Sequence, residues 1–151
     1  MTLGMKKRVS RNQRPIAVIG AGSWGTALAI LLSQKGYDVN LWGHSSDHVR
    51  QLLNDGENKK YLPNRKFPPN LQVSDQLVSG VKGADILVMA VPSHALRGVF
   101  LRIVPLIKSS CKIVSAVKGV ENETLQTMTQ VMAEVCSQHL TQEDSDIEIG
   151  V

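Results

Sequence analysis

The sequence has 151 residues, of which 42% are hydrophobic and 20% are charged; it is long enough for one globular domain with its own core and too short for two ordinary domains. Its 17 Lys and Arg residues exceed its 13 Asp and Glu residues, for a net charge of +4. Five of the basic residues precede Pro15: Lys6, Lys7, Arg8, Arg11 and Arg14. From Pro15 onward 12 basic residues face 13 acidic ones, and a body without an overall positive field argues against nucleic-acid binding.

The basic amino terminus and the small number of cysteines limit the domain organisation and the compartment. We expect residues 1–14 to form a disordered basic extension and residues 15–151 to form the folded domain. Cys111 and Cys136 are the two cysteines, too few for a disulfide framework or for a four-sulfur zinc site. We therefore predict no metal site and a reducing compartment, the cytoplasm.

A secretory signal peptide is an alternative for the amino terminus. The basic start, the uncharged run 16–32 and the triplet Ala27-Leu28-Ala29 resemble such a signal with its cleavage site. Glycines interrupt the run at spacings typical of a strand, turn and helix, and the run falls short of the about 20 residues of a membrane span. We therefore favour a strand, turn and helix of the folded domain over a signal peptide, and we predict no membrane span.

The chain then alternates short apolar runs with helix-length segments, which is typical of a parallel α/β sheet. Residues 16–19 predict a strand buried on both faces. A helix with one buried face is predicted next, because apolar residues recur there at i, i+3, i+4, i+7 and i+8. These residues are Trp24, Ala27, Leu28, Leu31 and Leu32. Lys35-Gly36 is expected to end this helix. A second strand is predicted at 38–42 and a helix through residue 53, with Ser46 or Asp47 as its N-cap.

The prolines 63, 68 and 69 predict a surface connection over residues 54–70, without helix or sheet. A strand at 71–73 follows, then a helix capped by Ser74 or Asp75 that ends at Val81. Residues 86–91 predict a strand that Pro92 ends, and Ser93 is expected to cap a helix carrying Leu96, Val99, Phe100 and Val104. A strand at 113–117, a helix at 124–139, a loop at 141–146 and the start of a sixth strand at 147–151 complete the series.

Gly20-Ala21-Gly22-Ser23-Trp24-Gly25 matches G-x-G-x-x-G directly after the first strand and at the start of the first helix. In this context Gly20 permits the tight turn, Gly22 permits close approach of a pyrophosphate, and Gly25 permits close packing of helix on strand. The helix amino terminus then faces the phosphates. We predict a Rossmann-type doubly wound, mainly parallel sheet of order 3-2-1-4-5-6 that binds a dinucleotide; a ligand-free glycine turn is the alternative.

The end of the second strand predicts which dinucleotide is accepted. NAD-specific domains place an Asp or Glu there for the ribose hydroxyls, but this chain has Trp42-Gly43-His44-Ser45, and Asp47 is better explained as a helix cap. His44, Ser45 and Arg50 are able to donate to a 2′-phosphate. We therefore predict that NADP is accepted and favoured, with NAD as the other candidate; the alternative for His44 is an exposed loop residue.

Five segments in this order and spacing resemble the amino-terminal part of the NAD(P)-dependent sn-glycerol-3-phosphate dehydrogenase family, over about residues 15–151. The segments are I-G-A-G-S-W-G-T-A-L-A at 19–29, L-W-G-H at 41–44, Y-L-P-N at 61–64, V-P-S-H at 91–94 and K-G-V at 118–120. The resemblance implies cofactor contacts from Ser23, Trp24, His44, Ser45 and Tyr61, and contacts of Lys118 with both cofactor and glycerol phosphate.

The residues His94, Tyr61 and Lys118 each have an alternative interpretation. His94 follows a strand end near the expected nicotinamide and is a candidate proton donor, but a capped helix start explains it equally and the resemblance does not support it. The alternative for Tyr61 is a packed loop, and that for Lys118 is an ordinary surface lysine.

The resemblance implies interconversion of dihydroxyacetone phosphate and sn-glycerol 3-phosphate by hydride transfer, which supplies glycerophospholipid synthesis. The family's catalytic lysine lies beyond Val151, so no catalytic residue is assigned; the 151-residue chain is expected to bind dinucleotide, to be nearly inactive and to be able to form a homodimer. The rivals are the cofactor half of another β-hydroxyacid-type dehydrogenase and a stand-alone NADP(H) sensor. Nucleic-acid binding by the extension is disfavoured because residues 6–14 contain no aromatic side chain.

Overall fold

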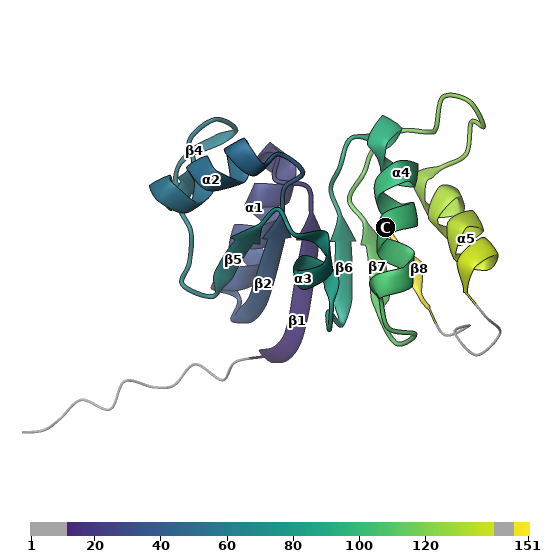
Figure 1. Ribbon diagram of the computed structural model, residues 1–151, viewed down its shortest axis with the longest axis horizontal. Coiled ribbons are helices and arrows are strands. Elements are labelled where there is room, and N and C mark those ends of the chain that lie inside the picture. Colours follow the sequence, from purple (N-terminus) through teal and green to yellow (C-terminus); the bar gives the residue numbers. More distant parts are fainter. Residues whose placement is uncertain (1–11, 141–146) are drawn as a thin grey trace, which may run out of the picture.

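Six parallel strands form the central sheet of the computed structural model, which describes residues 12–140 and 147–151. Their order is β5-β2-β1-β6-β7-β8, and the polypeptide forms a layer of helices on each side of them (Figure 1). The strands are β1 (Asn12–Ile19), β2 (Tyr37–Trp42), β5 (Leu71–Ser74), β6 (Ile86–Met89), β7 (Lys112–Ser115) and β8 (Ile149–Gly150). Counted without the separate β3–β4 hairpin, this is the predicted order 3-2-1-4-5-6, so the doubly wound fold is confirmed.

The two faces of the sheet follow from the alternation of side chains along β1. Ile16 and Val18 point into one apolar cluster, which includes residues of helices α1 (Ser23–Gln34) and α2 (Ser46–Asp55). Ala17 and Ile19 point into the other, which is covered by α3 (Leu77–Val81), α4 (Ser93–Ile103) and α5 (Met128–His139). A short 3-10 helix, η1 (Val104–Leu106), follows α4. The run 16–32 is thus part of the buried strand and helix of the core.

The buried side of α1 differs from the predicted stripe. Its buried residues are Gly25, Thr26, Ala29, Ile30 and Ser33, whereas Trp24 and Leu31 are 55% and 49% exposed; the prediction was wrong for these two. Leu28 and Leu32 are partly buried against the cluster, as expected. The polar Thr26 and Ser33 are tolerated inside because each is hydrogen-bonded, Ser33 donating to the carbonyl of Ala29 at 2.8 Å.

The segment predicted as a plain surface connection contains a β-hairpin, so that prediction was wrong. Strands β3 (Glu57–Asn58) and β4 (Leu62–Lys66) pair antiparallel. The Glu57 carboxylate is buried and accepts from the backbone N–H of Asn64 at 3.1 Å and from Lys66 Nζ at 3.0 Å. Each strand of a two-stranded hairpin has one edge whose backbone groups do not pair with another strand. Proline, which has no backbone N–H to donate, is tolerated at such an edge, and β4 includes Pro63.

Three predicted helix caps are corrected by one or two residues. The N-cap of α2 is Ser45, whose Oγ accepts from the N–H of His48 at 3.3 Å, and is neither Ser46 nor Asp47. Gln76 precedes α3 in place of Ser74 or Asp75. Pro92 occupies the N-cap of α4, so Ser93 is its first residue.

The carboxyl-terminal elements are also shorter than predicted. The helix expected from Thr124 begins at Met128, because Thr127 and Gln130 form a capping box that fixes its start. Strands β6 and β7 each end two residues early, at Met89 and Ser115, and Val104 belongs to η1. The loop predicted at 141–146 lies outside the described residues, as do residues 1–11 of the predicted extension; residues 12–14 belong to β1.

Candidate functional site

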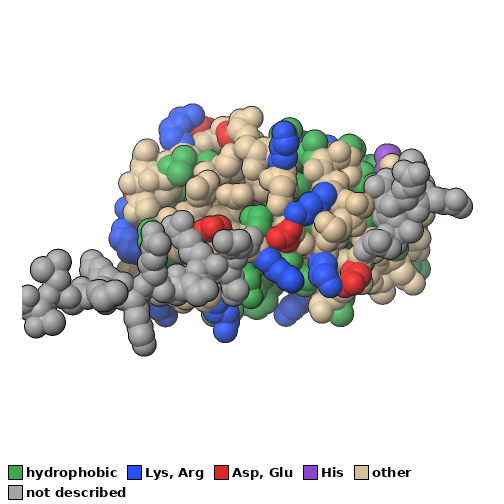
Figure 2. All heavy atoms as spheres, turned by 90° about the horizontal axis from the view of Figure 1, so that it is seen from below, with side chains coloured by type: hydrophobic (Ala, Val, Ile, Leu, Met, Phe, Trp, Pro, Cys, Tyr) green, Lys and Arg blue, Asp and Glu red, His purple; other side chains and the backbone are tan. Residues whose placement is uncertain are grey.

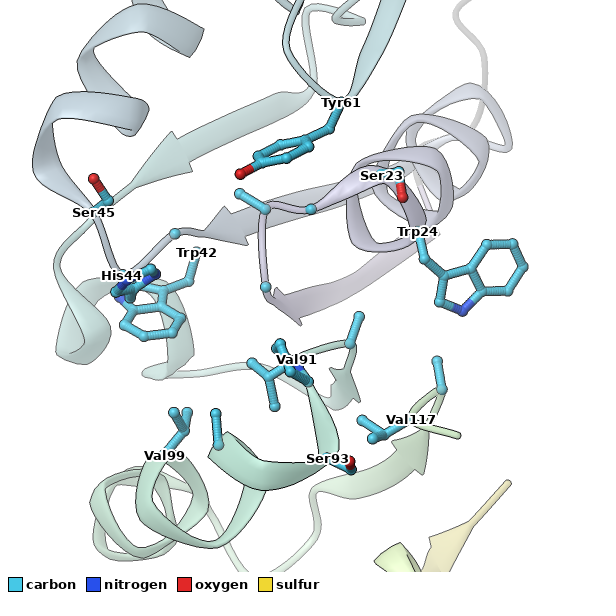
Figure 3. A pocket seen from close by; sticks show the side chains of 18 of the residues that line it. Ser23, Trp24, Trp42, His44, Ser45, Tyr61, Val91, Ser93, Val99 and Val117 are labelled. Atoms are coloured by element: carbon cyan, nitrogen blue, oxygen red, sulfur yellow. The ribbon is translucent and has the colours of Figure 1, made fainter. Parts of the chain in front are cut away.

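A cleft of about 940 Å³ opens at the edge of the sheet where β1, β2, β6 and β7 end. In open α/β sheets ligands bind beyond the carboxyl ends of the strands, where the chain order reverses; here that reversal lies between β1 and β6. Figure 3 shows side chains from the ends of these strands converging on the cleft, with Tyr61 of the hairpin above and Val91 and Val99 below.

Most of the residues predicted to contact a cofactor line this cleft. They are Gly20, Gly22, Ser23, Trp24, His44, Ser45, Tyr61 and Lys118. Gly25 does not line the cleft because it lies beneath the turn, against Gly20 and Ala90. In Figure 3 the Trp24 indole projects from α1 on the side away from His44 and Tyr61.

The three glycines of the turn have different steric surroundings. A Cβ on Gly20, whose φ is +119°, would lie 2.5 Å from the carbonyl oxygen of Ala90. A Cβ on Gly25 would lie 1.8 Å from the carbonyl oxygen of Gly20, whereas a Cβ on Gly22 meets no atom within 4 Å. Gly20 and Gly25 are therefore required by the packing of the turn itself, and Gly22 faces space in the cleft.

The amino terminus of α1 meets the cleft at Gly22. Gly22 is the N-cap of α1, no side chain caps the helix and no acidic residue occupies its first turn. The first N–H groups and the positive end of the helix dipole are therefore available to an anion.

Two residues that the sequence analysis missed hold the glycine turn. The side-chain amide of Asn58, in β3, donates to the carbonyl of Ala21 at 3.1 Å and to Thr26 Oγ1 at 2.8 Å. His48 Nε2, in α2, lies 3.2 Å from the same Ala21 carbonyl; because a carbonyl only accepts, we assign the proton to Nε2. No sequence motif identifies either residue, because each contacts Ala21 from a distant position in the chain.

The cleft beyond β2 contains several polar donors. His44, Ser45, Lys60 and Tyr61 line it, and Lys60 Nζ lies 4.9 Å from the centre of the Tyr61 ring. The Ser45 hydroxyl accepts from His48 and keeps its own hydrogen to donate. Arg50, predicted as a further donor, instead pairs with Asp47 at 3.2 Å on the surface and does not line the cleft.

The other end of the cleft is formed by the loops after β6 and β7. Ser93 and His94 come from the start of α4, and Val117 and Lys118 come from the loop after β7. The exposed Lys118 precedes Gly119, whose φ is +104°. The predicted Lys118 and the candidate His94 are thus brought to the same end.

The Lys and Arg side chains along the cleft give it a positive charge. Lys60, Arg102 and Lys118 line it together with His44, His48 and His94, and among residues 12–140 and 147–151 no Asp or Glu lines it. Such a cleft favours an anionic ligand. Lys60 and Arg102 were not predicted from the sequence. Neither residue directly follows the carboxyl end of a predicted strand, where ligand-binding residues were expected.

The opposite edge, where the strands begin, has a mixed charge. Figure 2 views the molecule from that edge and shows Asp and Glu side chains beside Lys and Arg. Lys112 pairs there with Glu148 at 2.7 Å, and Lys108 pairs with Asp85. Within residues 12–140 and 147–151 no helix is long and apolar enough to span a bilayer, and no three His, Cys, Asp or Glu side chains of these residues gather to hold a metal ion.

Comparisons with known proteins identify the family to which the chain is similar. The family described as NAD-dependent glycerol-3-phosphate dehydrogenase N-terminus matches residues 15–143. Glycerol-3-phosphate dehydrogenase (NAD(P)+) of Desulfotalea psychrophila is 55% identical over 119 residues, which are 79% of this chain and 35% of that protein. The enzyme of the same name from Chlorobium limicola is 46% identical over 79% of this chain and 36% of its own.

A solved structure gives the same result in three dimensions. Glycerol-3-phosphate dehydrogenase from Coxiella burnetii superposes with a TM-score of 0.77 at 39% identity, over 81% of this chain and 37% of that chain. The chain thus spans about a third of the length of the relatives it matches. The family match over residues 15–143 shows that the chain belongs to the family of the NAD-dependent glycerol-3-phosphate dehydrogenase N-terminus.

Proposed function

We propose that this chain forms the dinucleotide-binding part of an enzyme that interconverts dihydroxyacetone phosphate and sn-glycerol 3-phosphate, a precursor of glycerophospholipids. The observation that carries the proposal is the cleft itself, in which a glycine turn and an uncapped helix start meet the charged side chains of Lys60, Arg102 and Lys118. Its relatives, about three times longer, bear the name of that activity.

The residues present fit a dinucleotide from end to end. The open space at Gly22 and the start of α1 suit the pyrophosphate, and His44, Ser45 and Tyr61 suit the adenosine half. Ser93, His94 and Lys118 would then face the nicotinamide half, which supplies the hydride when it is bound. Lys118 is exposed at this end and is our candidate for contact with both the cofactor and the substrate phosphate.

We further propose that the cleft accepts NADP and favours it over NAD. In the part of the chain that the structure describes, no carboxylate lines the cleft beyond β2, so none of these residues repels a 2′-phosphate. His44 and Ser45 supply hydrogen-bond donors at this position, and Lys60 adds a positive charge. Cys111 and Cys136 are buried free thiols, which supports our proposal of a reducing compartment, the cytoplasm.

Titration of the 151-residue chain with NADPH and NADH tests both proposals. Binding can be followed through the fluorescence of Trp24, which is 55% exposed beside the glycine turn, whereas Trp42 is buried; a Trp24→Phe variant identifies its signal. We expect both cofactors to bind and NADPH to bind at least as tightly. Absence of binding would contradict the function, and NADH binding about tenfold tighter, or ~1.4 kcal/mol, would contradict the preference alone.

A pair of lysine variants assigns the binding to this cleft. Lys118→Met is expected to weaken NADPH binding, because it removes a positive charge from the lining. Lys112→Met is the matched control, since Lys112 lies at the other end of β7 and pairs with Glu148. Equal effects of the two variants would place the ligand elsewhere.

The activity is tested separately from binding. We expect the 151-residue chain to bind NADPH with little reduction of dihydroxyacetone phosphate, and a longer chain of the relatives' length to reduce it. Turnover of short β-hydroxyacids in preference to glycerol 3-phosphate by that longer chain would favour another dehydrogenase of this fold.

A further inference from the structure

Arg97 is the centre of an ion-pair cluster that joins three segments beside the cleft. Its Nε donates to Glu121 Oε1 at 2.7 Å and its Nη2 to Glu121 Oε2 at 2.8 Å, a two-pronged pair between α4 and the loop after β7. Further bonds at 3.2–3.3 Å reach Gln126 and, in α5, Glu134. The guanidinium thus fixes the direction of the loop as well as its distance from α4.

The loop that Arg97 holds is the one that carries Lys118. Glu121 follows Lys118 by three residues and closes the loop on itself: its N–H donates to the carbonyl of Gln126 at 2.9 Å, and its carbonyl accepts from Leu125 at 2.8 Å. Its carboxylate also accepts from Thr124 Oγ1 at 2.6 Å. A displacement of Glu121 would therefore disturb the hydrogen-bonded turn at residues 121–126.

The loop also approaches α4 one turn before Arg97. Ser93 and Arg97 are spaced i and i+4, so they share one face of α4. A Cβ on Gly119 would lie 3.9 Å from Ser93 Oγ, and Ser93 and Lys118 both line the cleft. The loop therefore passes close to α4 at Gly119, the residue after Lys118, and is hydrogen-bonded to α4 at Glu121.

We propose that Arg97 is a positioning residue that holds Lys118 at the nicotinamide end of the cleft, acting through Glu121. The proposal rests on the function proposed above for Lys118. Ion pairs at the surface stabilise a fold little, but a two-pronged pair that is 28% and 18% exposed fixes geometry. A lysine in place of Arg97 provides the charge without the planar fork.

A double-mutant cycle with Lys118 separates positioning from general stability. We expect Arg97→Met to raise the NADPH dissociation constant about tenfold when Lys118 is present and less than about twofold in the Lys118→Met background, because coupled residues are not additive. Arg97→Lys should restore only part of the affinity, and the control Lys108→Met, which removes the pair with Asp85, should leave it unchanged. Equal losses in both backgrounds, or no loss, would overturn the proposal.

Hydrogen exchange gives a readout that needs no ligand. The amides of Glu121 and Leu125, which close the loop, are expected to exchange about tenfold faster in Arg97→Met than in the wild type, since local opening costs less. Unchanged exchange would overturn the positioning role. Failure of the wild type to bind NADPH would instead overturn the proposed function, and the exchange result would still decide whether Arg97 holds the loop.

Discussion

The side-chain amide of Asn58 donates to the carbonyl oxygen of Ala21 at 3.1 Å and so fastens the β3–β4 hairpin to the glycine turn. The same amide reaches Thr26 Oγ1 at 2.8 Å, inside α1. Its carbonyl oxygen accepts from the backbone N–H of Tyr61 at 3.2 Å. One fully buried side chain therefore sets the position of Tyr61 relative to the turn over which it lies.

Replacing Asn58 is expected to loosen both elements. Asn58→Ala removes three hydrogen bonds in a buried site, so we expect a loss of about 2 kcal/mol or more in the free energy of unfolding, together with weaker NADPH binding. Asn58→Asp keeps the shape but faces the Ala21 carbonyl with a carboxylate, and should lose at least as much. The exposed Asn54→Ala is the control, expected to stay within ~0.5 kcal/mol in urea unfolding. Equal stability of the Ala variants at 54 and 58 would contradict this role.

Two alanine substitutions in the turn should separate folding from binding. Gly25→Ala forces a Cβ to within 1.8 Å of the Gly20 carbonyl, so we expect a large fall in thermal midpoint. Gly22→Ala meets no atom within 4 Å and should cost about 1 kcal/mol or less as an N-cap change, yet weaken NADPH binding because its methyl group enters the space for the pyrophosphate. The hypothesis fails if Gly22→Ala binds NADPH as the wild type does.

The parts of the fold that the sequence predicted correctly are those where local pattern and burial agree. The uniformly apolar runs of β1 and β6 are buried on both faces, which makes them recognisable without any partner. The orientation of α1 was not predictable in this way, because Thr26 and Ser33 are buried through hydrogen bonds while Trp24 is exposed.

In the site, too, residues placed by the local sequence pattern were predictable, and residues placed by tertiary packing were not. Gly22, His44 and Lys118 follow strand ends, so the sheet topology alone brings them to one edge. Asn58 reaches Ala21 across 37 positions of the chain, and Arg97 reaches Glu121 across 24. Such contacts depend on how the hairpin and α4 pack, which no spacing in the sequence encodes.

The cofactor preference should respond to a single charge at residue 44. His44→Asp adds a carboxylate to a cleft whose described lining residues include none, and we expect it to weaken NADPH binding about tenfold or more relative to NADH, or ~1.4 kcal/mol. His44→Asn is the matched control, similar in size without the charge, and should change the ratio less. Parallel titrations of the three proteins measure this ratio; an unchanged ratio in His44→Asp would place the 2′-phosphate elsewhere.

Acid stability should report the pair between Arg97 and Glu121. Hydrogen bonding to Arg97, and then to Thr124, lowers the pKa of Glu121 from 4.5 to about 2 in the folded protein. A group with a lowered pKa stabilises the fold fully above its unfolded pKa and loses that contribution as the pH falls toward the folded one. This window runs from 4.5 down to about 2.

Glu121→Gln is therefore expected to be less stable than the wild type at neutral pH and to lose less stability as the pH falls through that window. Urea midpoints at about pH 7, 5 and 3 measure the difference between the two proteins, which should shrink toward the acid end because the wild-type carboxylate becomes protonated. Glu123→Gln, an exposed neighbour without an ion pair among the described residues, should follow the wild type throughout. Parallel curves for Glu121→Gln and the wild type would mean that the ionised Glu121 contributes nothing to holding the loop.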